Sequence, residues 1–583
     1  MKRRHGLLAG VCSGITALVI LMTVALAGAG TTTAVAASSC TATLSAAETW
    51  GDRFNLHVAV TGSDTWTVTL GLKPRQSLQN SWNAKVTASG STITATPSGA
   101  GNNFGVTIMN GGGSNTDWPT VSCTIPGTTT PPTTPPPTTP PPSGTAQLKP
   151  RIVIMTDITS ANWEPDDLQS LIHVLAGADM YQIDGIVSTT GWSLDGSSPL
   201  QTSHIHDVIN AYAKDLPRLM KRSGQTGFLS DESRQKIGYW PSPDYLRGVV
   251  REGLNVRGMG GVGSGKDSAG SNHVINVVDR SDPRPVWVTF WGSGNTLAQA
   301  LWRVQNTRSA AELNQFVSKV RVYAITDQDR GYTGEGYANS SQAWMRKTFR
   351  NLFYIWAESA WGEYGSKIKS SYWSQYTSKI QGRGSLGGLY PTWKYIVEGD
   401  SPSWLHLWPG LNDPGDPSQY GFGGRFVYGT GPDGQTQAYV DNSGDAANQS
   451  RAAVNRTLQD QTNDFISRID WATNGTGNRN PRAVVNGDSG YAPVTVDVSR
   501  GTSVTLSADG TTDPDGNTVG YGWTQDTGAG YSGTVGLSGA NTRSVTVQVP
   551  SDAAGKTIHL VLRAADNGSP VLASYRRVVL RVG

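Results

Sequence analysis

The stretch Arg151-Ile-Val-Ile-Met-Thr156 indicates the fold of the middle of the chain, together with the later residues Leu168, Leu171, Ile172 and Leu175 and the segment Ile183-Asp-Gly-Ile-Val187. The first and last segments are short apolar runs typical of buried strands, and the apolar residues between them recur at helical spacing. This alternation of strand and helix continues to about residue 476. It predicts a mostly parallel sheet covered by helices.

Linkers and changes of pattern divide the rest of the chain. The Thr- and Pro-rich run at residues 128–147 can bury no core and favours an extended spacer. On either side of the α/β region, short runs alternate apolar and polar residues, as at 54–60 and 558–563, which is typical of β-sandwiches. We therefore predict a multidomain chain, an α/β domain flanked by two β-sandwiches. Its parts are a signal peptide at 1–36, a β-sandwich at 37–127, the linker at 128–147, the α/β domain at 148–476, a linker at 477–484 and an immunoglobulin-like β-sandwich at 485–583.

The N-terminus has the pattern of a leader for export. Lys2-Arg-Arg-His5 precedes an apolar run at residues 7–26, and Ala34-Val-Ala36 follows as an A-x-A cleavage site. A membrane anchor is the alternative, because the run approaches the ~20 residues that span a bilayer. Polar and small residues interrupt the run, so we predict a secreted protein with no membrane segment in its mature form.

The charge balance excludes a nucleic-acid partner. Lys and Arg number 47 against 44 Asp and Glu, and three of those basic residues lie in the predicted leader. The mature chain is therefore formally neutral and has no excess of basic residues to hold phosphates.

Two cysteines, Cys40 and Cys123, remain after cleavage of the leader. An even count in an oxidising compartment predicts a disulfide, and two free thiols are the alternative. Residues 40–123 resemble bacterial family-2 cellulose-binding modules, with a Cys near each end, Trp50 soon after the first and Trp82 in the middle. The resemblance implies that Trp50 and Trp82 bind cellulose and that Trp66 lies in the core; the alternative places every Trp in the core.

Acidic residues gather where the first α/β strand ends, in Met155-Thr-Asp157-Ile-Thr-Ser-Ala-Asn-Trp-Glu164-Pro165-Asp166-Asp167. Pro165 suits the first turn of the next helix, with two aspartates beside it. A helix N-terminus favours each acid by only ~0.3–1 kcal/mol, too little to hold three repelling carboxylates together. A hard divalent cation can hold them, and outside the cell Ca²⁺ is the natural candidate. A helix cap with solvated acids is the alternative.

These residues are similar to the nucleoside hydrolase superfamily, whose first strand ends in Asp-x-Asp-x-x-x-Asp-Asp around a catalytic calcium, and specifically to its secreted, divergent branch. The resemblance covers about residues 148–476. It implies that Asp157 is a metal ligand and the general base, that Asp167 is a metal ligand, and that Asp166 binds the metal or a sugar hydroxyl and takes part in catalysis.

Two later segments extend the resemblance. Trp287-Val-Thr-Phe-Trp291-Gly-Ser-Gly-Asn295 resembles the family's Gly-x-x-Thr-Asn-x-Ala element, which implies a metal contact from the Trp291 main chain. Gly399-Asp400 resembles the late His-Asp element, which implies that Asp400 is the last metal carboxylate.

The chain departs from the family where a nucleobase would bind. Gly399 replaces a His that protonates the leaving base, and Gly191-Trp192 replaces a Gly-Asn that touches ribose. Glu164 is a further candidate for the general acid. Candidate substrate contacts are Asp166, Trp192, Asn295, Asp327 and Asp329.

The first functional hypothesis is a secreted, calcium-dependent glycoside hydrolase of plant cell-wall polysaccharide or its oligosaccharides, anchored by the cellulose-binding module. The second is a secreted nucleoside hydrolase that cleaves N-glycosidic bonds. The third is a non-catalytic protein that binds cellulose or oligosaccharide.

Overall fold

A computed structural model describes residues 40–124, 148–331 and 336–583. The predicted leader and the linker at 128–147 lie outside these residues. The chain divides into two units, Met1–Thr130 and Pro131–Gly583, which are described separately. Among the residues that the structure describes, no helix is both long enough and apolar enough to pass through a bilayer.

The N-terminal unit is a sandwich of two four-stranded sheets. Alternate residues of β2, from Phe54 to Val60, are buried between the sheets, as the period of two predicts. The predicted disulfide is confirmed, joining Cys40 to Cys123. One sheet has the order β1 (Thr41–Thr49), β2 (Arg53–Thr61), β7 (Asn103–Met109), β4 (Ser77–Trp82), and the other β5 (Ala84–Ser89), β6 (Thr92–Pro97), β3 (Thr67–Gly71), β8 (Thr120–Thr124).

The middle of the chain forms an eight-stranded sheet. All neighbouring strands are parallel except the edge pair β15 and β16, which is antiparallel. The predicted mostly parallel sheet is therefore confirmed. Its order is β11 (Val250–Glu252), β10 (Gln182–Ser188), β9 (Arg151–Thr156), β12 (Val286–Phe290), β13 (Val320–Ile325), β14 (Phe353–Ala357), β16 (Gln437–Val440), β15 (Val427–Thr430).

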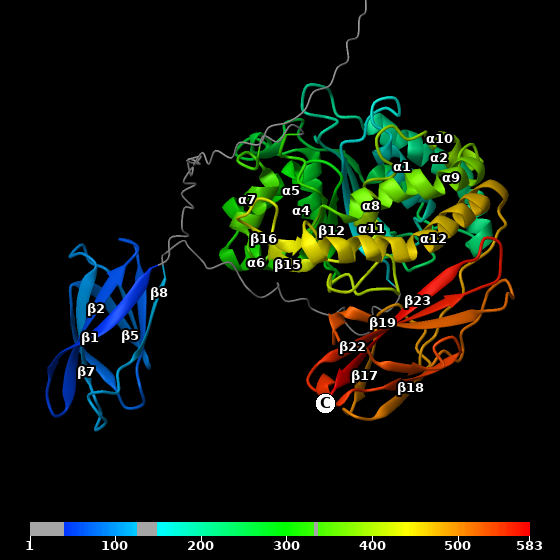
Figure 1. The fold of residues 1–583 in the computed structure, drawn as a ribbon. Coiled ribbons are helices and arrows are strands. Elements are labelled where there is room, and N and C mark those ends of the chain that lie inside the picture. Colours follow the sequence, from blue (N-terminus) through cyan, green and yellow to red (C-terminus); the bar gives the residue numbers. More distant parts are fainter. Residues whose placement is uncertain (1–39, 125–147, 332–335) are drawn as a thin grey trace, which may run out of the picture. The chain divides into compact units, whose positions relative to one another are not determined.

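Helices cover both faces of this sheet (Figure 1). Successive residues of β9 point to opposite faces, so Ile152 and Ile154 join one core while Val153 and Met155 join the other. The first core is completed by α1 (Asp166–Ala176), α2 (Thr202–Ser223), α3 (Pro243–Gly248), α8 (Ala360–Lys367), α9 (Trp373–Lys379), α10 (Gly384–Leu389), α11 (Ser401–Leu405) and α12 (Gly444–Asn474). The second is completed by α4 (Ala269–Asp279), α5 (Asn295–Thr307), α6 (Ala310–Lys319) and α7 (Ser341–Thr348).

The C-terminal region is a second β-sandwich that packs on α12 (Figure 1). Asp460 of α12 accepts hydrogen bonds from Arg563, at 2.7 Å, and from the Tyr575 hydroxyl. The buried Arg577 donates to the Leu411 carbonyl at 2.7 Å. One sheet of this sandwich has the order β17 (Val494–Val498), β23 (Ala573–Val582), β22 (Thr557–Ala565), β19 (Gly520–Gly530). The other sheet has the order β18 (Ser503–Ser507), β21 (Ser544–Gln548), β20 (Gly536–Ser538).

Candidate active site

The candidate site lies at the carboxyl ends of the parallel strands, the edge where open α/β sheets bind ligands. Asp157 directly follows β9, and Trp291 directly follows β12 beside it. The Trp291 amide donates to the Met155 carbonyl at 2.8 Å, which continues the strand pairing into the site. The Asp157 carboxylate accepts a hydrogen bond from the Ser193 amide at 2.9 Å, so the loop after β10 forms one wall.

Helix α1 brings two further carboxylates to this edge. Pro165 precedes the helix, and Asp166 and Asp167 occupy its first turn, as predicted. The Thr156 hydroxyl accepts from the Ile158 amide at 3.0 Å and donates to Asp167. The end of β9 is thereby tied to the start of α1.

Asp400 is positioned by a constrained turn at the start of α11. Glu398, two residues earlier, has a φ of 48° although it is not glycine. Such a backbone costs about 1–3 kcal/mol and persists only where its surroundings hold it. The fully buried Glu398 carboxylate lies 2.8 Å from Nδ1 of His173 and accepts from the hydroxyls of Tyr390, at 2.6 Å, and Ser401, at 2.9 Å. These contacts fix the turn that carries Asp400.

The carboxylates repel one another in a buried setting. Burial raises the pKa of Asp157 to about 7 and that of Asp166 to about 6, and the Asp166 charge contributes to the shift at Asp157. Burial and the charges of Asp166 and Asp157 raise the pKa of Glu164 to about 9. Burial, then the Asp400 charge, holds the pKa of Asp167 well above its usual range, and burial and the neighbouring acids do the same for Asp400. The acids that the sequence singled out therefore lie within electrostatic reach of one another.

Acidic side chains near the amino ends of the strands, in contrast, pair with arginines. Asp184 pairs with Arg151 at 2.7 Å and with Arg280 at 2.8 Å. Asp282 pairs with Arg284 at 2.5 Å. Asp167 and Asp400 have no comparable arginine partners among the described residues, so any negative charge on them is uncompensated.

The residues fit a hard cation in charge and donor type. Oδ2 of Asp400 is buried and has no hydrogen-bond partner among the described residues. A Cβ on Gly191 or Gly292 would stand 2.2 or 2.8 Å from an oxygen of Asp157, so both glycines keep space open around that carboxylate. A carboxylate with a free buried oxygen is the kind of group that Ca²⁺ binds.

The side chains do not yet form a closed set of ligands. No group of three or more His, Cys, Asp or Glu within the described ranges stands as a ready metal site. The Trp291 carbonyl accepts a hydrogen bond from Nε2 of Gln328 at 2.5 Å, and it has a second lone pair. Binding of a cation would therefore require the carboxylates to move closer together.

Two predicted substrate contacts, Asp327 and Asp329, follow β13 and are buried. Asp327 pairs with Arg346 at 3.0 Å. Asp329 accepts from the Ser341 amide at 2.9 Å, at the start of α7. The structure thus uses both carboxylates to hold α7 against the sheet.

Asn295 and Trp192 lie on the loops around Asp157. The Asn295 amide group is buried and donates to the Val256 carbonyl at 2.6 Å, so it supports a loop. Trp192 is half-buried, and its indole donates to the Arg330 carbonyl at 3.0 Å. Trp192 directly precedes Ser193, whose amide donates a hydrogen bond to the Asp157 carboxylate. Trp192 is therefore carried by the loop that contacts Asp157.

The structure adds site residues that the sequence did not single out. Arg257 donates to the Gly191 carbonyl at 3.0 Å, and its charge opposes the rise in the Asp157 pKa. The Trp361 ring lies 3.8 Å from the position of a Cβ on Gly399. Local sequence gives no signal for either residue, because both reach the site from loops or helices far along the chain.

In the N-terminal module, Trp66 is fully buried, as predicted, and stacks on Phe104. Trp50 is 46% exposed. Trp82 is half-buried, and a Cβ on Gly105 would stand 2.0 Å from its ring, so the indole lies against the strand. Both tryptophans predicted to bind cellulose therefore reach the surface.

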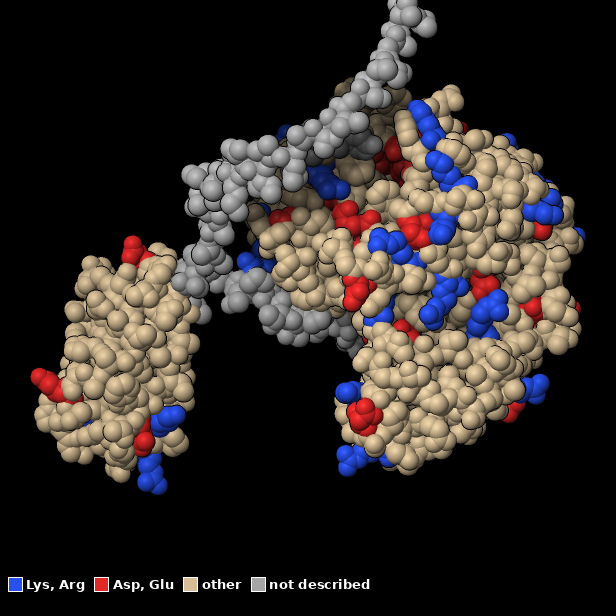
Figure 2. All heavy atoms as spheres, viewed as in Figure 1, with Lys and Arg blue, Asp and Glu red and all other residues tan. Residues whose placement is uncertain are grey.

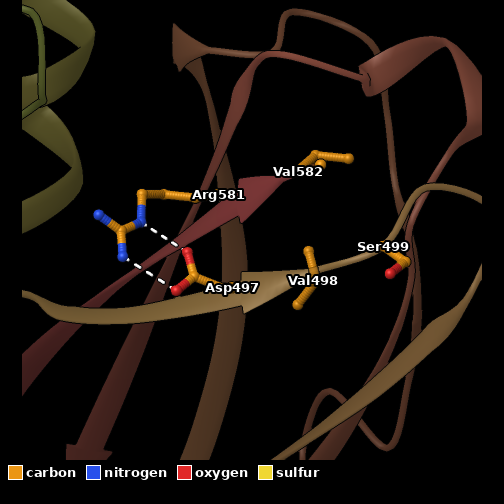
Figure 3. A pocket seen from close by; sticks show the side chains of 6 residues that line it. Asp497, Val498, Ser499, Arg581 and Val582 are labelled. Carbon is orange, nitrogen blue, oxygen red and sulfur yellow. Dashed lines mark hydrogen bonds and ion pairs between the residues drawn. The ribbon is translucent and has the colours of Figure 1, made fainter.

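Two other surface features of the described residues are weaker candidates for a binding site. On the face shown in Figure 2, blue basic and red acidic side chains are scattered over the molecule without a broad basic patch. A hollow of about 430 Å³ lies at the end of the C-terminal sandwich (Figure 3). There Asp497 and Arg581 neutralise each other through hydrogen bonds of 2.7 and 3.0 Å, so neither charge is left for a ligand.

Two family models match parts of the chain. A family model described as the nucleoside hydrolase-like domain of cellulose-binding Sde182 matches residues 151–426, and one described as the C-terminal domain of cellulose-binding protein Sde0182 matches residues 503–582. The internal xylan-binding domain of Cellulomonas fimi xylanase D is 52% identical over 15% of this chain and 95% of that one, with a TM-score of 0.14.

A solved structure matches most of the chain. It is a nucleoside hydrolase-related hypothetical protein from Saccharophagus degradans, described as associated with carbohydrate metabolism. It is 39% identical, and the match covers 75% of this chain and 100% of that chain, with a TM-score of 0.65. The chain therefore belongs to the family of Sde182-type cellulose-binding proteins with a nucleoside hydrolase-like domain.

Proposed function

We propose that the protein is a secreted, calcium-dependent glycoside hydrolase that acts on plant cell-wall polysaccharide or its oligosaccharides while its N-terminal module holds it on cellulose. The observation that carries the proposal is the cluster of uncompensated carboxylates at the carboxyl edge of a nucleoside hydrolase-like sheet. The family's cellulose-binding description and the relative's association with carbohydrate metabolism favour a sugar polymer as the substrate. The disulfide fits an oxidising compartment.

The calcium would be held by Asp157, Asp167, Asp400 and the Trp291 carbonyl, where it would supply positive charge that favours ionisation of a water molecule. Asp157 accepts the proton of the attacking water. Asp166 accepts a hydrogen bond from a sugar hydroxyl and orients the ring. These roles follow from the family resemblance and from the position of both carboxylates at one edge of the sheet, where burial raises the pKa of each.

Glu164 is the proposed proton donor to the leaving oxygen. Without metal, a pKa of about 9 keeps its carboxyl protonated at neutral pH, and burial, the largest cause of this shift, would persist with calcium bound, which suits a general acid. The ammonium of Lys394 opposes this rise in pKa. Gly399 offers no side chain beside Asp166, so a nucleobase would find no proton donor at that position. This arrangement favours an O-glycosidic bond over an N-glycosidic one.

A non-catalytic carbohydrate-binding protein is the second candidate. Two observations favour it: the family is described by what it binds, and the described acidic side chains do not form a ready metal site. In that case binding of the oligosaccharide would not depend on Asp167.

The test is hydrolysis of cell-wall polysaccharides, aryl glycosides and nucleosides by the full chain, with and without a calcium chelator. We expect release of sugar, dependent on calcium and abolished in Asp167→Asn. Asp244→Asn, a substitution at an exposed residue of α3, is the matched control and should leave activity unchanged. Hydrolysis of nucleosides alone would indicate an N-glycosidase. Oligosaccharide binding without hydrolysis, unchanged in Asp167→Asn, would support the non-catalytic candidate.

A further inference from the structure

The two most exposed large aromatic side chains of the described residues are Tyr395, at 64%, and Trp163, at 62%. They flank one cation, since Nζ of Lys394 lies 5.3 Å from the centre of the Trp163 ring and 5.1 Å from that of the Tyr395 ring. Two solvent-facing rings around one amine form a compact surface, here called the aromatic platform (Trp163, Lys394, Tyr395).

The platform adjoins the carboxylate site. Trp163 immediately precedes Glu164, whose carboxyl is affected by the charges of Asp166 and Asp157. Tyr395 belongs to the same loop as Asp400. The platform and the carboxylates are therefore carried by the same two loops.

Hydrogen bonds hold these loops in place before any ligand binds. Nζ of Lys394 donates to the Trp163 carbonyl at 3.1 Å, which joins one loop to the other. Gln169 of α1 donates to the Pro391 carbonyl at 3.0 Å and accepts from the Glu398 amide at 3.0 Å. The buried Gln169 thus fixes both ends of the segment that carries the platform.

A second lysine supports the other side of that segment. Nζ of Lys369 lies 3.9 Å from the centre of the Trp393 ring and donates to the Tyr395 carbonyl at 3.3 Å. Trp393 in turn meets Trp373 of α9 edge to face, with ring centres 6.4 Å apart. The Tyr395 backbone is therefore held, while its ring stays in solvent.

The chemistry of the platform suits a sugar. An indole or phenol ring offers a flat apolar face on which the C–H face of a pyranose can stack, and an ammonium donates hydrogen bonds to hydroxyl groups. Preformed rings lose little conformational entropy on binding. A diffusible single sugar bound at the carboxylates would not reach beyond them, whereas a chain would.

We propose that the aromatic platform is a subsite for a glycan chain that extends outward from the carboxylates. The inference rests on the proposed function, and it deepens it by making the substrate an oligosaccharide or polysaccharide. A glycoside of one sugar would leave the platform empty.

The test compares Trp163→Ala and Tyr395→Ala with Phe228→Ala in the full chain. Phe228 is a comparably exposed aromatic residue, 48% exposed, outside the two loops. Trp50→Ala is added to every protein to weaken binding by the N-terminal module. Binding of cellulose- and xylan-derived hexasaccharides is measured by calorimetry, and hydrolysis of each hexasaccharide is compared with that of its single-sugar aryl glycoside.

We expect hexasaccharide affinity and kcat/KM to fall about 5- to 50-fold in Trp163→Ala and Tyr395→Ala. Hydrolysis of the aryl glycoside by these two variants should change little. The Phe228→Ala protein and the conservative Trp163→Phe protein should keep most of their hexasaccharide affinity and kcat/KM. Hydrolysis with equal losses on long and short substrates, or with no loss, would overturn the subsite and leave the proposed function standing. Weakened hexasaccharide binding in a protein that hydrolyses nothing would uphold the subsite and reject the hydrolase.

Discussion

Calcium should stabilise the protein, and the effect should depend on pH. In the experiment, calcium is removed from the protein and then returned at two pH values. In the folded protein without metal, burial raises the pKa of Asp157 to about 7 and that of Asp166 to about 6. A raised pKa means that the folded state holds its protons more tightly than the unfolded chain. The resulting stability is fully present below about pH 4 and is lost as pH rises through about 6 to 7.

The magnitude follows from these shifts. Relative to the usual value of 3.8, they correspond to about 4 kcal/mol for Asp157 and about 3 kcal/mol for Asp166, as upper limits. Calcium at about 100 times its dissociation constant would restore about 2.7 kcal/mol at neutral pH. At about 2–4 °C per kcal/mol, this is a rise in Tm of about 5–10 °C. Near pH 5 protons occupy the same carboxylates, so the rise should be below about 2 °C.

The assay is calorimetric or dye-monitored melting of the full chain after chelation, at about pH 5 and about pH 7.5, with calcium or magnesium returned. Asp167→Asn should lose the calcium effect, because it removes a proposed ligand of the cation. Asp244→Asn should behave as the wild type. A calcium shift of equal size at both pH values, or one that survives in Asp167→Asn, would refute the reasoning.

Two further predictions concern other parts of the chain. Arg577→Ala should lower the free energy of unfolding by about 3–5 kcal/mol in urea titrations, because it removes the closer of the two arginines that pair with buried Asp526 and leaves two buried carbonyls without that donor. Arg581→Ala, which removes an exposed ion pair on the same strand, should cost under about 1 kcal/mol. Comparable losses in both variants would contradict this. In the N-terminal module, Trp50→Ala and Trp82→Ala should reduce retention on cellulose in pull-down assays without unfolding the module, and Trp66→Ala should instead destabilise it by about 3–5 kcal/mol. Full retention in Trp50→Ala would remove that residue from the binding face.

The parts of the fold that could be predicted are those that local patterns determine. The apolar run of β9 has no polar face, so it had to be buried on both sides, and the two cores on its opposite faces confirm this. The first turn of α1 was predictable because Pro165 and two aspartates mark a helix start. Asp400 was predicted as a site residue from the family resemblance and not from a local sequence pattern, since the turn that positions it depends on the distant His173.

What local patterns could not give are contacts between loops. Asp327 and Asp329 look like free acids in the sequence, yet Arg346 and the start of α7 satisfy them. Conversely, Trp163 looks like one more core tryptophan until Lys394 is found beside it in an exposed position. In both cases the decisive partner arrives from another loop or helix, so only the folded chain reveals it.

The contrast between the two ends of the sheet separates structural acids from functional ones. Asp184 lies near the amino end of β10 and Asp400 at the start of α11, and both are buried. Asp184 is surrounded by two arginines, so its charge is compensated and contributes to the fold. Asp400 has an oxygen with no hydrogen-bond partner within the described residues and a pKa raised by neighbouring acids. An unpaired buried polar oxygen costs about 1–3 kcal/mol, so this oxygen lowers the stability of the fold. Such an oxygen among other acids is expected where a cation or a substrate supplies the missing partner.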